Sequence, residues 1–302
     1  MSLLMAKEGK PAMPIVLSTR ASDGTKAVAA ELAGYLRQIT GAAFEITTGD
    51  GSAGIVLGTL TEFPDPKFQE PLSIRDGFDG KEAYVIRTEP GRMRLIGATD
   101  LGVSHTAFRL LESLGCRWFF PGQTWEVVPR RPELTVGLNE ASRPAILARR
   151  IWYGYGFFPD DSSKAGAGRD ARSAADYRDW ARHNRMASSF TVSAGHAWQS
   201  IILHNRAVFE AHPEYLALVK GKRQGEQLCV SNPKVRELAI AYAREQLSKN
   251  PAADMVSMEC PDGDGQCECD ECRKLGSVSD RVFGLANDVA TMVAREFPGK
   301  MV

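Results

Sequence analysis

The stretch Asp254–Cys272 limits the possible folds of this chain more than any other. It starts with a short apolar run, Met255–Met258, which predicts a buried strand. The chain then breaks at Pro261, passes through a turn rich in Gly and Asp, and reaches three cysteines in a C-x-C-x-x-C pattern before a helical pattern (Cys267, Cys269 and Cys272). A strand that ends in carboxylates and leads into a loop and a helix is typical of the carboxyl face of a (β/α) barrel. The alternative is a loop that disulfides or a metal ion hold in place and that has no catalytic role.

Composition and charge exclude several classes of protein. The chain has 302 residues, enough for two ordinary domains, and its 43% hydrophobic and 25% charged residues are typical of globular proteins. The 37 Lys and Arg balance 37 Asp and Glu. The chain therefore has no net charge that would favour binding to nucleic acid or to an anionic membrane. No apolar run reaches the roughly 18 residues of a bilayer span.

The first residues, Met1–Lys7, lack the apolar core and cleavage site of a secretion signal. We expect them to be a cloning remnant, and a signal peptide that has been removed is compatible with this start.

The first half of the chain has the pattern of a separate domain. Strands are predicted at 15–18, 44–48 and 55–59, followed by a hairpin that turns at Pro90-Gly91, and helical spacing covers 25–38 and 102–114. This order predicts an α+β domain over residues 12–140. The Pro-punctuated connection from Pro129 to Pro144 predicts the domain boundary.

Two motifs of this half carry a resemblance. Glu82-Ala-Tyr-Val-Ile-Arg and Ile96-Gly-Ala-Thr-Asp-Leu-Gly-Val, with the helix after them, resemble the domain that precedes the catalytic barrel in glycoside hydrolase family 20 and in bacterial α-glucuronidases. The resemblance implies an accessory domain that supports a barrel and does no chemistry.

The second half alternates strand and helix patterns. Strands are predicted at 149–157, 190–196 and 255–258, helices at 174–184, 234–248 and 279–297, and a hairpin near 216–232. The alternation predicts an α/β fold with a parallel sheet, the first part of a (β/α)8 TIM-type barrel over residues 145–302. Such a barrel needs eight strands and about 250 residues, so we expect the barrel to be truncated in this sequence.

Four motifs in this half resemble the bacterial family catalogued as domain of unknown function 4838. They are His212-Pro-Glu-Tyr, Gly221-Lys-Arg, Gln227-Leu-Cys-Val-Ser-Asn-Pro and the stretch from Pro261 to Cys272. The resemblance implies a glycoside-hydrolase-like protein of an exported carbohydrate-degrading system, and hence a secreted or periplasmic location. It also implies that Cys229 joins the three clustered cysteines.

Glu259 and Asp262 are the candidate catalytic residues, because glycoside hydrolysis needs carboxyl groups on either side of the sugar. Their close spacing resembles the adjacent Asp-Glu pair of glycoside hydrolase family 20, although Cys-Pro intervenes here. The alternative is that Asp262 and Asp264 only cap the turn.

Four residues at predicted strand ends are candidates for binding the carbohydrate ligand: Arg150, Tyr155, His196 and Trp198. Flat rings cover sugar faces, and a guanidinium bonds hydroxyls or a carboxylate through its forked donors. Each ring has a competing interpretation as a core residue.

Two disulfides or one structural zinc site would each need four cysteines, and four are grouped here: Cys229, Cys267, Cys269 and Cys272. We expect disulfides, with structural zinc and free thiols as the alternatives, and no other cofactor. Cys116 and Cys260 are expected to be buried apolar residues.

The sequence predicts a carbohydrate-active protein, a glycoside hydrolase of a polysaccharide or oligosaccharide that uses carboxylate acid and base groups. The alternative is a non-catalytic carbohydrate-binding or scaffold protein with the same fold. A third class, a metal-dependent enzyme, would use the cysteines. The sequence sets no oligomeric state.

Overall fold

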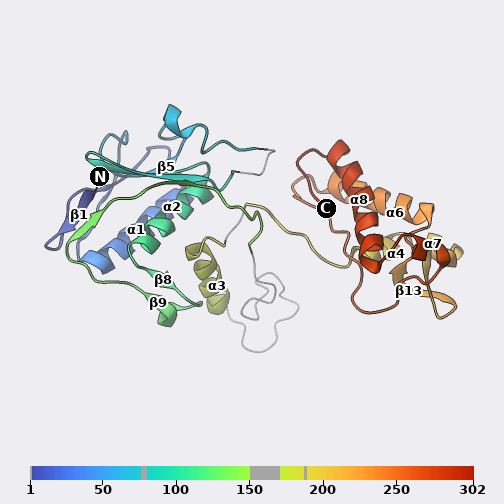
Figure 1. The fold of residues 1–302 in the computed structure, drawn as a ribbon. Coiled ribbons are helices and arrows are strands. Elements are labelled where there is room, and N and C mark those ends of the chain that lie inside the picture. The colour runs from blue at the N-terminus through green and yellow to red at the C-terminus, as the bar shows by residue number, and fades with distance from the viewer. Residues whose placement is uncertain (1, 76–79, 150–170, 187–188) are drawn as a thin grey trace. The chain divides into compact units, whose positions relative to one another are not determined.

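The computed structural model describes residues 2–75, 80–149, 171–186 and 189–302. The chain divides into two compact units, Met1–Ser189 and Phe190–Val302 (Figure 1). Each unit has its own hydrophobic core. The sequence-based domains at 12–140 and 145–302 remain a proposal.

The first unit is built on a six-stranded mixed sheet in the order β11-β6-β7-β5-β3-β4. The four strands at one side, β4, β3, β5 and β7, are parallel, and β6 and β11 are added antiparallel. The hairpin predicted across Pro90-Gly91 is confirmed as β6–β7. The strands are β3 (Ile15–Leu17), β4 (Ile46–Thr48), β5 (Gly54–Thr59), β6 (Tyr84–Glu89), β7 (Arg92–Gly97) and β11 (Asn139–Ser142).

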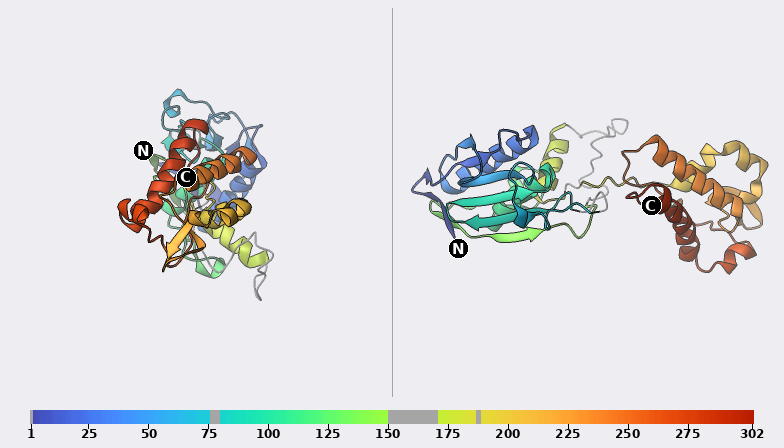
Figure 2. Two further views of the ribbon diagram at one scale, coloured as in Figure 1. Left: turned by 90° about the vertical axis from the view of Figure 1, so that its right-hand side faces the viewer. Right: turned by 90° about the horizontal axis from the view of Figure 1, so that it is seen from above.

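Two helices, α1 (Asp23–Thr40) and α2 (Asp100–Ser113), lie together on one face of this sheet (Figures 1 and 2). Successive side chains of a strand point to opposite faces. Ile55 and Leu57 accordingly pack in the core with the helices, whereas Val56 packs in a smaller core with Phe63 on the other face. Both helices were predicted from their apolar spacing, and both are confirmed.

Gly97 and Gly102 allow the chain to turn tightly from β7 into α2. A Cβ added to Gly97 would lie 2.5 Å from the carbonyl carbon of Gly102 and 2.7 Å from the carbonyl oxygen of Thr99. A Cβ added to Gly102 would lie 2.5 Å from the carbonyl oxygen of Ala83. All of these neighbours are backbone atoms, so only glycine fits at either position.

Smaller elements complete the first unit. A three-stranded sheet has the order β10-β1-β2, and β8 pairs with β9. Met5 in β1 is fully buried, so the first residues are integrated into the fold. These elements are β1 (Leu3–Lys7), β2 (Lys10–Pro11), β8 (Arg117–Trp118), β9 (Glu126–Val127), β10 (Leu134–Val136) and the 3-10 helices η1 (Pro66–Phe68) and η2 (Gln123–Trp125).

Helix α3 (Ala171–His183) belongs to the first unit by its contacts. The indole Nε1 of Trp180 donates to the carbonyl oxygen of Trp118 at 3.0 Å. His183 Nε2 lies 2.6 Å from Glu31 Oε1, and Arg182 donates to the second oxygen of the same carboxylate. The helix itself was predicted, but its packing on α1 depends on partners that are about 150 residues away in the sequence and show no local pattern.

The second unit contains α4 (Ala197–His204), α5 (Arg206–Ala211), η5 (Pro213–Tyr215), the hairpin β12 (Leu216–Val219) and β13 (Lys222–Leu228), α6 (Pro233–Lys249), α7 (Asp270–Lys274) and α8 (Val278–Glu296). Asn232 caps α6 as predicted, since its Oδ1 accepts from Lys234 N at 2.9 Å. Ser277 and Asp280 form a capping box at the start of α8. Arg244 in α6 bonds Glu296 in α8 at 2.6 Å, and this contact holds the Glu296 pKa at about 2.

The predicted parallel barrel strands are not present as strands in the described part of the second unit. The expected strands at 190–196 and 255–258 pair only at isolated parallel bridges, His196 with Glu259 and Met255 with Met301. A run of strand-forming residues becomes a strand only where a neighbour supplies hydrogen bonds along its length. The expected strand at 149–157 lies almost entirely outside the described residues. The fold is therefore mixed α/β, and the sheet topology of the described residues does not confirm a barrel.

Candidate functional site

Three of the predicted site residues meet in the second unit. His196 and Glu259 face each other across a parallel bridge, and the backbone N–H of Trp198 donates to the Glu259 carbonyl oxygen at 3.4 Å. His196 Nε2 lies 3.5 Å from Asp262 Oδ2. The His196 side chain is 32% exposed and the Asp262 side chain 93% exposed, and Glu259 is also exposed. The group is therefore open to solvent and to a ligand.

Local contacts fix this group from both segments. Ser257 Oγ donates to the carbonyl oxygen of Gly195 at 2.8 Å and accepts from Glu259 N at 3.2 Å. The buried Gln227 on β13 donates from Nε2 to the carbonyl oxygen of Pro261 at 3.0 Å. Pro261 stands between Glu259 and Asp262, so the hairpin sets the path of the chain between the two carboxylates.

Of the other predicted ligand-binding residues, only Trp198 lies within the described part of the chain, and its side chain does not join the group. Trp198 is 1% exposed and lies in the core of the second unit, so its ring presents no face to a sugar, and the prediction is corrected. The apolar side of α4 places it there, and the short pattern of that helix was not predicted. Arg150 and Tyr155 lie outside the described residues.

A polar cleft of about 290 Å³ opens beside His196. The serines Ser193, Ser200 and Ser257 contribute to its wall, together with Tyr242 of α6. Sequence reasoning did not identify these residues, because isolated serines carry no spacing signal. The further lining residues are Ala194, Gly195, Ala197, Gln246, Leu247, Asn250, Ala253, Met255 and Val256.

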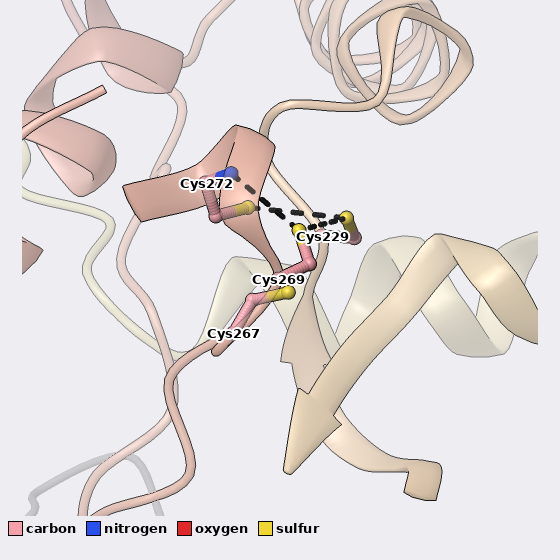
Figure 3. Close-up of side chains that lie close together, drawn as sticks. All are labelled: Cys229, Cys267, Cys269 and Cys272. Atoms are coloured by element: carbon pink, nitrogen blue, oxygen red, sulfur yellow. Dashed lines mark hydrogen bonds between the residues drawn. The ribbon is translucent and has the colours of Figure 1, made fainter. Parts of the chain in front are cut away.

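The four cysteines that the family resemblance grouped together do meet (Figure 3). Cys229 follows β13, whereas Cys267, Cys269 and Cys272 come from the loop before α7 and from α7 itself. Their Sγ atoms all lie within 4.8 Å of one another. The Cys229 Sγ lies 3.8 Å from that of Cys269 and 3.9 Å from that of Cys272. Cys229, Cys267 and Cys272 are buried and Cys269 is half-buried.

The structure contains no disulfide among the six cysteines, all of which lie within the described residues. A disulfide would bring two sulfurs to about 2.05 Å, whereas Cys229 lies 3.8 and 3.9 Å from two different sulfurs. The expectation that Cys116 is buried is confirmed, and Cys260 is half-buried.

Hydrogen bonds within the cluster shift its thiols in opposite directions. The bond from the Cys272 thiol, helped by Arg223 and Ser231, lowers the Cys229 pKa, and the same bond together with burial raises the Cys272 pKa. Burial opposes ionisation of Cys269, but the backbone N–H of Cys272 and the neighbouring thiols still lower its pKa. The cluster thus lowers the pKa of the Cys229 and Cys269 thiols and raises that of Cys272.

The first unit has a second cleft, of about 310 Å³, that sequence reasoning did not identify. Aromatic residues of α3 and of the β8 segment line it beside the Glu31 carboxylate, including Trp118 and Trp180. Trp118 Nε1 donates to the Tyr35 hydroxyl at 2.9 Å, and burial raises the pKa of Tyr35. Because Trp118 is buried and its indole nitrogen is already bonded, we interpret these rings as packing for α3.

These features define a class of protein: a mixed α/β chain of two units that carries a histidine–carboxylate group and a buried four-cysteine cluster in the second unit. The family described as Domain of unknown function (DUF4838) matches residues 120–302. The chain belongs to this family, as the motifs between His212 and Cys272 predict.

Solved structures of glycoside hydrolases are similar to this chain at low identity. One is a family GH115 4-O-methyl-α-glucuronidase, BtGH115A, with specificity for decorated arabinogalactans (TM-score 0.45, 16% identity, 98% of this chain and 41% of that chain). Others are a GH20 β-N-acetylhexosaminidase from Streptomyces coelicolor A3(2) (0.40, 14%, 99% and 63%) and a chitobiase from Flavobacterium johnsoniae (0.44, 12%, 99% and 50%). The chain spans less than two thirds of the length of each. No curated protein matches it.

No helix in the described part of the chain has both the length and the apolar character needed to cross a membrane.

Proposed function

We propose that this chain belongs to a carbohydrate-active protein, a glycoside hydrolase in which Glu259 and Asp262 supply carboxylate acid and base chemistry to a polysaccharide or oligosaccharide. The observation that carries the proposal is that the Glu259 backbone pairs with that of His196, whose Nε2 lies 3.5 Å from Asp262 Oδ2. The group is solvent-accessible, and the cleft of about 290 Å³ beside His196 is lined by hydroxyl and amide groups suited to sugar hydroxyls.

The arrangement of the second unit supports a (β/α)8 barrel. Three segments run parallel in chain order, since His196 bridges to Glu259 and Met255 bridges to Met301. Val256 N donates to the Met301 carbonyl oxygen and Met301 N to the Asp254 carbonyl oxygen, both at 3.0 Å. Helices separate the segments along the chain. Strand–helix–strand repeats with adjacent parallel strands are how a (β/α)8 barrel begins, and its sites lie where Glu259 and His196 lie, at the carboxyl ends.

In the proposed reaction, one carboxyl group donates a proton to the glycosidic oxygen, and a second carboxylate acts as nucleophile or activates water. Glu259 is assigned the proton donor. Asp262, whose Oδ2 lies 3.5 Å from His196 Nε2, is assigned the second carboxylate, and the imidazole beside it is assigned to binding the substrate. We place the protein outside the cytoplasm, secreted or periplasmic, where such polysaccharides occur.

The test uses the full-length protein and a panel of glycans, with Glu259→Gln and Asp262→Asn as the variants. Removing a general acid lowers turnover by about 10²- to 10⁴-fold, so each variant should lose at least 100-fold on the cleaved glycan. Asp264→Asn is the matched control, since Asp264 is an exposed acid in the same turn and should change turnover less than about twofold. Full turnover in both variants contradicts the assignment. A glycan that is bound but never cleaved by the wild type would favour the non-catalytic alternative.

A further inference from the structure

The cysteine cluster has a geometry that disulfides do not explain. A tetrahedral zinc ion with bonds of 2.3 Å to four sulfurs places those sulfurs about 3.8 Å apart. The Cys229 Sγ lies 3.8 Å from the Cys269 Sγ and 3.9 Å from the Cys272 Sγ, and every pair in the cluster lies within 4.8 Å. Two disulfides would instead give two short distances and four longer ones.

We propose that Cys229, Cys267, Cys269 and Cys272 bind one structural zinc ion through four thiolates. The proposal is independent of the carbohydrate chemistry, because four protein ligands leave no open position for a substrate or a water. Binding forms four Zn–S bonds, and each cysteine that still carries a proton releases it to solvent, with no change in oxidation state. The set combines a C-x-C-x-x-C segment with one remote cysteine.

The surroundings of the sulfurs fit thiolate ligands. The backbone N–H of Leu218 donates to the Cys267 Sγ at 3.3 Å, and that of Cys272 donates to the Cys269 Sγ at 3.4 Å. Hydrogen bonds of this kind from a second shell orient metal ligands and tune their charge. A zinc ion with four thiolates carries a net charge of about −2. The guanidinium of Arg223 faces Cys229, Cys267 and Cys269 and offsets part of this charge.

The site would join the hairpin to the loop that follows Asp262. The backbone N–H of Glu268 donates to the Leu218 carbonyl oxygen at 2.8 Å, and Lys220 N donates to the Glu268 carboxylate at 2.8 Å. Gln227 bonds Pro261 from the same hairpin. With zinc bound, β12, β13 and the loop from Glu259 to Cys272 form one rigid support.

The experiment is metal analysis of the full-length protein, purified in reducing buffer without chelator. We expect one zinc per chain. Cys269→Ser and Cys272→Ser should each lower the zinc content at least fivefold, whereas the matched controls Cys116→Ser and Cys260→Ser should retain one equivalent, because both cysteines lie outside the cluster.

A second measurement does not depend on the folding of variants. Cobalt added to the metal-stripped wild type should give the visible ligand-field and charge-transfer bands of a tetrahedral tetrathiolate. Removing zinc should lower the melting temperature of the wild type by several degrees, because the metal binds only the folded form. Iron as the bound metal, two disulfides in the cluster by mass spectrometry, or four thiols that stay metal-free when zinc is supplied would each overturn the proposal.

Discussion

Glu31 holds α3 against the first unit, and its substitution gives a quantitative test of that packing. Its carboxylate accepts from Arg182 and lies 2.6 Å from His183 Nε2. A hydrogen bond to a charged group contributes about 1.5–3 kcal/mol. The Arg182 side chain is 30% exposed and the Glu31 side chain 25% exposed, so water screens part of the Arg182 bond. Since Gln retains one neutral hydrogen bond, we expect Glu31→Gln to lower the free energy of unfolding by about 2 kcal/mol.

The effect should depend on pH in a defined direction. Burial raises the Glu31 pKa, but the bonds from His183 and Arg182 outweigh it, and the pKa lies below its ordinary value. The folded state therefore binds fewer protons than the unfolded state near that pKa, and the stabilisation is fully present above the unfolded pKa of about 4.5. It is lost as the pH falls through the folded pKa. The Arg182 guanidinium and the His183 imidazole face Glu31, with the Tyr35 hydroxyl nearby.

The assay is thermal unfolding of the full chain, followed by tryptophan fluorescence because Trp118 and Trp180 report on the α3 contact. For a unit of this size, about 2 kcal/mol corresponds to about 4–8 °C. We expect this difference between wild type and Glu31→Gln at about pH 7, and we expect it to shrink as the pH is lowered below the ordinary Glu pKa of 4.5. Glu70→Gln is the control, because its partner Arg75 forms an exposed ion pair. A shift below about 1 °C at neutral pH, or a shift that grows as the pH is lowered, would refute the reasoning.

Two further substitutions test the cores. Gly97→Ala should unfold the first unit or prevent its expression, because the new Cβ would meet backbone atoms of Thr99 and Gly102. The control is Gly34→Ala in α1, whose new Cβ meets open space and which should stabilise the folded protein by about 0.4–1 kcal/mol. Circular dichroism and soluble yield distinguish the two variants, and a native melting curve for Gly97→Ala would contradict the predicted clash. Leu285→Ala in α8 removes a fully buried side chain and should cost about 2–5 kcal/mol in chemical denaturation. Phe283→Ala in the same helix, where Phe283 is 66% exposed, should cost less than about 1 kcal/mol, and equal losses would argue against the α8 core.

Local signals were sufficient for most elements of the fold. The turn at Pro90-Gly91, the Asn232 cap and the apolar spacing of α1, α2, α6 and α8 each involve residues close together in the chain, so their physics is visible in the sequence. The packing of α3 on Glu31 was not predictable in this way, because it joins residues that are far apart in the sequence. The strands expected at 190–196 and 255–258 illustrate the same limit, since strand pairing depends on neighbours that the pattern does not contain.

The residues of the candidate site also differ in how far the sequence could predict them. His196, Glu259 and Asp262 were selected because each stands at a predicted strand end, and elements that run parallel bring such ends together. Trp198 was selected as an aromatic residue at the same predicted strand end as His196, and only the three-dimensional core shows that its ring is buried. The cysteine spacing identified three members of the cluster, while the fourth, Cys229, required the family motif, because a hairpin rather than a spacing rule brings it near.

The position of Cys229 has a consequence for how the second unit folds. Cys229 and Cys269 are separated by 40 residues, and the whole of α6 lies between them. Any bond that joins these sulfurs, through a metal or directly, closes the chain into a ring that contains α6. By the estimate for a disulfide, a ring of this size removes about 4 kcal/mol of conformational entropy from the unfolded chain. As long as the ring stays closed, a partly unfolded molecule keeps α6 tethered beside the hairpin, and refolding starts from a much smaller set of conformations.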